Sequence, residues 1–422
     1  MARLKKFLRR AAIGSLLVIS VLVLVFAFFN WRASRQVEAR LAPLREAGKP
    51  ISLTDLQPET LIDEDNAAKV VEGQAESLCT FDGYLAKAWN DTENEPEAQQ
   101  TQATIQVARR VSQEFPNLNQ TLRAASKLPA YQVGFDYTSD PTSLMDRMCD
   151  LKVPPRTIVR ALYGHGLMSL ADGKSDEAIQ DAIAILNWSR HVADQPLLIN
   201  HLIATACYGM GIDLTTQCLT TEDVTPIDRE ALLNSLSSES RMRDQFDRAI
   251  DTERAFGISS FASFPGSRFK YMLGELAAFL DTFAEFESFA KQPTGLAPEQ
   301  PVKQSLFGNL SWPSQRQGLV AFRRNQALTR AVRILAAWQD AGRKPEATLS
   351  DLALPEPVTT DPYDGSPIRI NVSSETVVVY SVGENLIDDD GAVVDGSDIG
   401  VHATQVQRTE TNRGHSFSVA VP

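Results

Sequence analysis

The apolar positions along this chain follow three successive patterns, each typical of a different kind of structure. Residues 11–29 carry no charge and no proline, and a helix of that length spans about 28 Å, close to the ~30 Å hydrocarbon core of a bilayer. From residue 62 to 342 apolar residues recur at helical spacing, and after residue 360 short β-branched runs alternate with turns. These patterns predict a mainly α protein with an N-terminal transmembrane helix, an exported α-helical domain and a small C-terminal α+β module.

The charges beside the first apolar run set its expected orientation. The first ten residues contain five basic side chains and no acidic one, which places this end in the cytoplasm by the positive-inside rule. A cleaved signal peptide is the alternative, but its apolar run is usually ~7–15 residues long and precedes a small-x-small cleavage site. No Ala-x-Ala site follows the run here. We therefore expect a single-pass anchor in the inner (cytoplasmic) membrane, with residues 11–30 in the lipid bilayer and the bulk of the chain outside the cytoplasm.

Turn and cap signals divide the chain further. The expected segments are a basic cytoplasmic tail (1–10), the transmembrane helix (11–30), a juxtamembrane spacer (31–61), an α-helical domain (62–312) and a helix with a small β module (313–422). Within the helical domain, 175–191 and 197–219 predict an αα-hairpin, since Asp194 and Pro196 between them signal a new helix start. Further helices are expected over 229–256, 267–289 and 315–342, and an edge strand over 416–421.

Charge and motifs exclude several kinds of function. A net charge of −12 argues against nucleic-acid binding. The sequence contains no glycine-rich phosphate-binding loop, so it does not predict nucleotide binding. Neither G-x-S-x-G nor H-E-x-x-H occurs, so an enzyme is not favoured. The Gly164-His-Gly166 and Gly209-Met-Gly211 pairs lack a third glycine and predict helix packing. No CxxC occurs among the four cysteines, which argues against a zinc site and thioredoxin chemistry. An exported location permits disulfides, but we interpret the cysteines as buried small hydrophobic residues.

Four titratable side chains of the helical region are the candidates for chemistry there. His165, His191 and His201 are expected to be ordinary interior or rim histidines, although the last two could meet across the hairpin. Glu253 lies on an apolar stripe, and burial would raise its pKa and suit it to acid–base work. The favoured interpretation is that Glu253 pairs with an arginine of a neighbouring helix.

The C-terminal block has an ordered series of motifs. A helix is followed by the turn Asp361-Pro-Tyr-Asp-Gly-Ser-Pro, a strand at 377–381, the Gly383-Glu-Asn turn, the Asp388-Asp-Asp-Gly run and Asp398-Ile-Gly. This order resembles the C-terminal part of type II secretion major pseudopilins, over about a quarter of the chain. The N-terminus departs from that family, because it lacks the prepilin Gly cleavage site and following Glu. The whole chain is similar to large membrane-anchored proteins of planctomycete-type bacteria, which adds no biochemical function.

The resemblance implies a calcium site, because the corresponding pseudopilin loop binds Ca²⁺. By position its ligands would be the carbonyls of Val382 and Ile387, the side chain of Asn385, and the carboxylates of Asp388, Asp389, Asp390 and Asp398. Asn385 stands where that family usually has Asp. Calcium takes 6–8 oxygen ligands, and this loop is rich in them. The alternative is a solvated acidic turn, whose internal repulsion is small at physiological salt.

Together these features predict a membrane-anchored cell-envelope protein with a structural or protein-binding role, stabilised by calcium at its C-terminal loop. One alternative is an envelope hydrolase, which requires a deep pocket that gathers Glu253 and the helical histidines. Another is a tetratricopeptide-like scaffold, which requires a concave groove built from stacked hairpins, although no 34-residue period is present.

Overall fold

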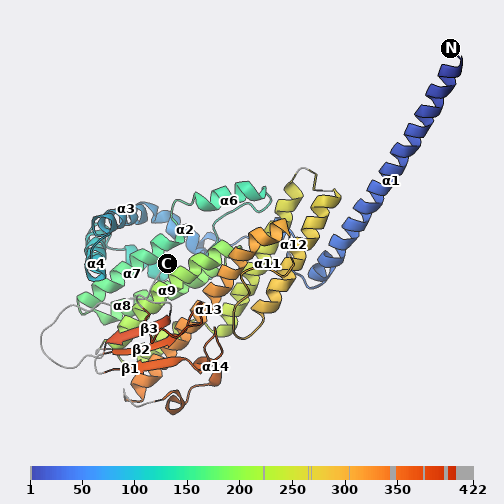
Figure 1. The fold of residues 1–422 in the computed structure, drawn as a ribbon. Helices are drawn as coiled ribbons and strands as arrows, with labels where there is room; N and C mark the ends of the chain where they lie inside the picture. The colour runs from blue at the N-terminus through green and yellow to red at the C-terminus, as the bar shows by residue number, and fades with distance from the viewer. Residues whose placement is uncertain are drawn as a thin grey trace.

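One unbroken helix, α1 (Ala2–Glu46), carries the apolar N-terminal run into the folded body (Figure 1). The structure is a computed structural model and describes residues 2–221, 224–264, 266–267, 269–303, 305–342, 348–373, 376–393 and 398–404. By length and composition α1 is a candidate membrane-spanning or signal-anchor helix. None of the residues in its most apolar stretch is buried inside the protein. Helices make up 69% of the described residues, which confirms the mainly α class.

The body consists of helices and one small sheet. Its helices are α2 (Ala67–Gly73), α3 (Ala75–Asp91), α4 (Glu97–Glu114), α5 (Leu118–Ala125), α6 (Pro141–Cys149), α7 (Pro155–Ala171), α8 (Ser175–Ala193), α9 (Leu198–Thr220), α10 (Pro226–Ser235), α11 (Glu239–Ser263), α12 (Lys270–Ala290), α13 (Leu306–Asp340) and α14 (Glu356–Thr359). The strands are β1 (Arg369–Val372), β2 (Thr376–Ser381) and β3 (Ile399–Thr404). Short 3₁₀ turns lie at Leu53–Leu56, Asp63–Asp65 and Leu349–Leu352.

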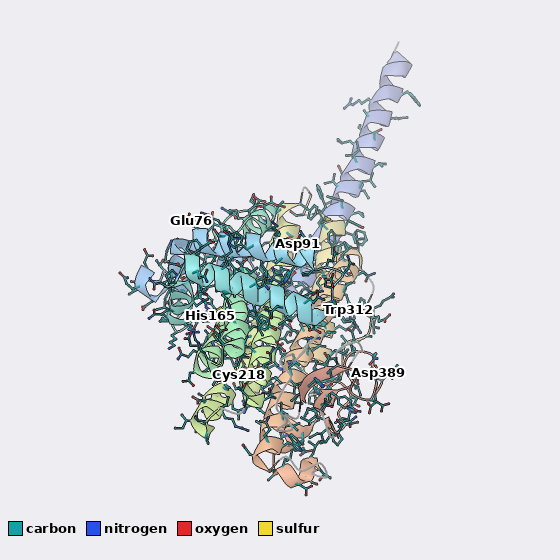
Figure 2. All side chains as sticks on the ribbon, turned by 90° about the vertical axis from the view of Figure 1, so that its left-hand side faces the viewer. Glu76, Asp91, His165, Cys218, Trp312 and Asp389 are labelled. Carbon is teal, nitrogen blue, oxygen red and sulfur yellow. The ribbon has the colours of Figure 1, made fainter. Side chains whose placement is uncertain are left out.

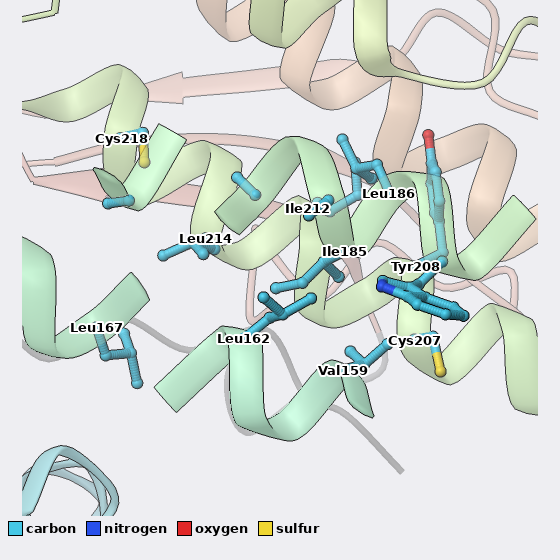
Figure 3. Close-up of a cluster of buried hydrophobic side chains, with 14 of the residues drawn as sticks. Val159, Leu162, Leu167, Ile185, Leu186, Cys207, Tyr208, Ile212, Leu214 and Cys218 are labelled. Atoms are coloured by element: carbon cyan, nitrogen blue, oxygen red, sulfur yellow. The ribbon is translucent and has the colours of Figure 1, made fainter. Parts of the chain in front are cut away.

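The αα-hairpin of α8 and α9 is present where the sequence predicts it, and it forms the centre of the helical core. Gly166 and Gly211 allow the close packing there, because a Cβ at these positions would lie 2.4 Å from a Leu214 methyl carbon and 2.8 Å from a Leu186 methyl carbon. Gly209 has open space instead, so helix packing does not explain it. All four cysteines are free, and Cys207 and Cys218 lie among the buried apolar side chains of this core (Figure 3). Cys79 and Cys149 are exposed, so the interpretation as buried small residues is wrong for these two.

Several helix boundaries differ from the sequence prediction. The single helix expected over 229–256 is wrong, because the chain turns at Leu236–Ser238 and Ser238 caps the start of α11 through the N–H of Arg241. Helix α12 begins at Lys270, three residues later than expected. Helix α13 begins at Leu306 and continues through Pro313, since Ser305 caps it and Trp312 is buried in its first turns.

The three strands form one antiparallel sheet in the order β1-β2-β3. The sheet packs on α13, and Val379 and Val401 of the sheet share one hydrophobic cluster with Leu328 and Leu335 of that helix. The core is therefore continuous between the helical region and the C-terminal module. Residues 416–421, where an edge strand was expected, lie outside the described residues.

The second half of α1 is packed against the body. Val37 and Leu41 are buried with the phenylalanines of α12, and Arg40 donates two hydrogen bonds to Asp281 at 2.7 and 2.9 Å. Further on, Leu53 is buried beside Tyr137. The segment 31–61, interpreted from sequence as a spacer, thus contributes side chains to two hydrophobic clusters.

Candidate functional site

The acidic loop after β2 is attached to the 361–365 turn by Arg369. The guanidinium of Arg369 donates to Asp361 at 2.9 Å, to Asp364 at 2.8 Å and to Asp388 at 3.2 Å. These carboxylates raise the pKa of Arg369, although partial burial opposes the shift more strongly than any single partner. One side chain on β1 therefore joins the turn, the sheet and the loop.

Asp361 organises the turn from inside the protein. Its side chain is fully buried and accepts hydrogen bonds from the N–H of Tyr363 at 2.8 Å, the hydroxyl of Ser381 at 2.7 Å and the N–H of Val382 at 3.0 Å. Gly365, with φ of 78°, closes the same turn by donating to the Asp361 carbonyl at 3.0 Å. The Asp-Pro-Tyr-Asp-Gly motif is thus a structural joint between α13 and the end of β2.

The side chains proposed as calcium ligands mostly hold the loop itself. Asn385 accepts from the N–H of Ile387 at 3.0 Å and donates to Asp389 at 3.1 Å. Asp388 accepts from the hydroxyl of Tyr380 and the N–H of Asp390, both at 3.1 Å. Val382 is buried, whereas Asn385, Ile387, Asp388 and Asp390 are exposed. Asp390 has φ of 57°, in the left-handed region.

Asp398 differs from the other carboxylates of the loop. It is 4% exposed, and its Oδ2 accepts from the N–H of Gly391 at 2.9 Å. Its Oδ1 is buried and has no hydrogen-bond partner among the described residues. Burial raises the pKa of Asp398, the backbone N–H groups of Gly391 and Asp389 oppose the shift, and the charges of Asp389 and Asp388 add to it. A cation would satisfy both this oxygen and the local charge.

The loop offers oxygen donors of the kind that calcium uses, but its carboxylates do not converge. Within the described ranges, no three acidic, histidine or cysteine side chains are arranged as a metal site. Residues 394–397, which include Asp395, lie outside those ranges. The acidic loop therefore supplies oxygen donors and the free oxygen of Asp398, but no preformed cage among the described residues.

His165 belongs to a buried ionic cluster between α5, α7 and α8. Asp181, which is fully buried, accepts from Arg123 Nε at 2.6 Å and lies 2.7 Å from His165 Nδ1. Arg123 also donates to the Glu177 carbonyl at 3.0 Å. Figure 2 shows His165 well separated from Asp389 of the acidic loop. Sequence reasoning missed Asp181, which stands on the apolar face of the amphipathic α8 between Ala178 and Ala182.

The other candidates of the helical region have separate surroundings. His191 lies 3.2 Å from the Ser126 carbonyl, whereas His201 packs against Phe246, so the two histidines do not form a pair. Glu253 accepts from the N–H of Leu198 at 3.2 Å and so caps α9 instead of pairing with an arginine. Burial raises the pKa of Glu253.

The hydrolase alternative requires a pocket that gathers Glu253 and the helical histidines. A cleft of about 780 Å³ lies between the end of α1 and the α8–α9 turn, and Lys49, Asp55, Asp194 and Arg248 contribute to its walls. As far as the structure describes the chain, neither Glu253 nor a histidine lines it. This cleft therefore does not gather the residues that the hydrolase alternative requires.

Two buried groups should give opposite pH dependences. Burial raises the pKa of Asp213 from 3.8 to about 6, so its contribution to stability is lost as pH rises through that range. Burial lowers the pKa of His201 from 6.5 to about 4, so its contribution is lost as pH falls. Neither ring nitrogen of His201 has a partner in the described part of the chain.

The two contributions therefore nearly cancel between pH 4 and 6.5, and we expect the free energy of unfolding to change little over that range. Replacing one group should reveal the pH dependence that the other group contributes. Relative to wild type, Asp213→Asn should gain up to about 3 kcal/mol above pH 6, and His201→Leu up to about 3 kcal/mol below pH 4. Urea titrations of the full chain in detergent at several pH values measure both differences. Equal offsets at all pH values in either variant would contradict the assignment.

The comparisons with known proteins add no identity. No protein-family model, no curated protein and no solved structure matches the chain. The inferences below therefore rest on the residues and contacts of this protein.

Proposed function

We propose that this is a membrane-anchored protein of the cell envelope, in which α1 spans the inner membrane and the body has a structural or protein-binding role on the far side. The observation that supports it most is the continuity of α1, whose apolar half is exposed and whose second half enters the hydrophobic core. An apolar helix exposed to water is unfavourable, and a bilayer removes that cost.

Ion pairs at the end of α1 and just beyond it attach the helix to the body. The paired Arg40–Asp281 contact fixes α1 to α12, and Lys49 beyond the helix end contacts Asp251 at 3.0 Å and Glu287 at 3.6 Å. An anchor that served only as a tether would not need such contacts. A fixed orientation is useful to a protein that presents one surface to a partner in the envelope.

Charged substitutions within α1 test the anchor. Arginine at the centre of a span costs about 2.5–3.5 kcal/mol of insertion, so Leu17→Arg combined with Leu22→Arg should release the full chain from membranes on alkaline carbonate extraction. Ile227→Arg, at an exposed apolar position of α10, is the matched control and should remain in the membrane with wild type. Extraction of wild type itself by carbonate would refute the anchor.

We also propose that calcium stabilises the C-terminal loop, supported by the buried free oxygen of Asp398. With Ca²⁺ at ~100 times its dissociation constant, wild type should gain about 2.7 kcal/mol over the same protein in chelator. Asp398→Asn should lose that gain and yet be at least as stable as wild type in chelator, because an ionised Asp398 is destabilising. Thermal unfolding of both chains measures this, with Asp364→Asn as the control that keeps the calcium response. Equal stabilisation of wild type and Asp398→Asn by Ca²⁺, or no stabilisation of wild type, would contradict the proposed calcium site.

A further inference from the structure

Large apolar side chains are exposed at the end of the α11–α12 hairpin that lies beside α1. Phe264, Phe269 and Tyr271 are 47%, 55% and 67% exposed. Leu306 and Leu310 at the start of α13 are 55% and 68% exposed, and their spacing puts them on one helix face. We call these five residues the apolar tip.

The start of α13 belongs to the same end of the molecule as the hairpin. Phe307 packs against Phe261 at a ring-centroid distance of 4.5 Å and against Phe264 at 5.9 Å. The N–H of Leu306 donates to Glu275, one turn along α12 from Tyr271. Figure 1 shows this end of α11 and α12 rising beside α1.

Two contacts fix the level of the apolar tip along α1. Phe269 lies 5.8 Å from Phe26 between ring centroids, and Asp281 binds Arg40. The contacts are separated by about 21 Å along α1 and about 18 Å along α12, so the two helices run side by side in the same direction. The start of α12 is therefore level with Phe26.

Phe26 lies within the apolar run, about 4–5 Å before its last residue, Phe29. If α1 spans the bilayer, Phe269 must then reach the boundary between hydrocarbon and headgroups. Aromatic side chains such as Tyr271 are favoured at that depth. An exposed apolar surface of this size otherwise needs another cover.

We propose that the apolar tip inserts into the membrane interface and forms a second contact of the body with the same leaflet. This inference rests on the proposed function, since the bilayer is placed by α1. Its consequence is that the body is fixed to the membrane at two points, α1 and the hairpin end, and cannot rotate freely about the anchor.

Lipid quenching of a fluorescent probe tests the insertion. The full chain is reconstituted in nanodiscs of phosphatidylethanolamine and phosphatidylglycerol, with Cys79→Ser and Cys149→Ser to remove the exposed thiols. A nitrobenzoxadiazole probe is attached at Phe269→Cys, and in a second variant at Tyr271→Cys, which does not depend on the Phe26 contact. Nitroxide lipids carry the quencher either near the headgroup or in the middle of the chain.

We expect the probe at both tip positions to be quenched more by the shallow nitroxide than by the deep one. Ile227→Cys, an apolar position 78% exposed on α10, should show no quenching, and Ile19→Cys should be quenched most by the deep nitroxide. Quenching at Ile19 without quenching at either tip position would overturn the insertion and leave the anchor intact. A shielded but unquenched tip would mean a protein cover, which also overturns it. Loss of quenching at Ile19 would instead refute the anchor itself.

Discussion

Asp361→Ala is expected to destabilise the protein by about 4–6 kcal/mol, the largest effect of any single substitution considered. The change removes the acceptor of two buried backbone N–H groups and of the buried Ser381 hydroxyl, and leaves Arg369 without its innermost carboxylate. Each buried donor left unsatisfied costs about 1–3 kcal/mol, and such costs are not fully additive. Urea denaturation of the full chain in detergent, followed by tryptophan fluorescence, measures the loss.

Asp364→Ala is the matched control for this prediction. Asp364 lies in the same turn and binds the same Arg369, but it is partly exposed and its N–H partner, Ser366, can be hydrated. Its loss should cost about 1 kcal/mol or less. If the two alanine variants were equally stable, the turn would not depend on the buried carboxylate.

Asp181→Ala should cost about 3–5 kcal/mol, the second largest effect, because it removes the closest and only buried counter-charge of Arg123 among the described residues and leaves the partly exposed Glu177 at 3.8 Å. Asp181 is fully buried and is bound by both Arg123 and His165. The double variant Asp181→Leu with Arg123→Met should lose much less than the sum of the two single losses, since no uncompensated charge then remains.

The exposed pair Arg109–Asp172 provides the control for the buried cluster. Its atoms are 2.6 Å apart, but the arginine side chain is 51% exposed. Arg109→Ala should therefore change the free energy of unfolding by about 1 kcal/mol or less in the same urea titration. A loss for Asp181→Ala no larger than that for Arg109→Ala would contradict the role given to the cluster.

Local signals predicted the helices well where the deciding residues were adjacent in sequence. Asp194 and Pro196 located the α8–α9 turn but not its caps, because Asp194 is the C-cap of α8 and α9 begins only at Leu198, whose N–H is bound by the distant Glu253. The turn at Leu236–Ser238 also has a local signal, because Ser238 is an N-cap residue, but the surrounding amphipathic pattern favours one continuous helix. The early start of α13 has a local signal in its N-cap Ser305, but Pro313 in its first turns argues for a later start. The burial of Trp312 against Phe286, which favours the early start, depends on a distant helix.

The loop chemistry was foreseen only in part. The sequence predicted the oxygen-rich composition, but not that Arg369 would bind three of its neighbouring carboxylates. A signal was available, because Arg369 is the only lysine or arginine between Lys344 and Arg408 in a strongly acidic segment. The isolation of Asp398 Oδ1 depends on how the loop folds over it, which no local pattern encodes.

The attachment of α1 was also beyond sequence reasoning. The segment after residue 30 lost its uniform apolar character and was interpreted as a spacer, although Val37 and Leu41 repeat at the spacing of one helix face. Their partners are the aromatic side chains of α12, more than 200 residues away. Long-range packing of this kind decides whether the body hangs from α1 by a flexible linker or packs directly against it.

The central claim is that α1 crosses the membrane and leaves the body outside the cytoplasm, and the native cysteines test it directly. Cys79 and Cys149 are exposed on the body, whereas Cys207 and Cys218 are buried. A membrane-impermeant maleimide added to intact, reductant-treated spheroplasts should label the full chain, and the Cys79→Ser/Cys149→Ser variant should not react. Labelling of wild type only after the spheroplasts are lysed would place the body in the cytoplasm and contradict the account.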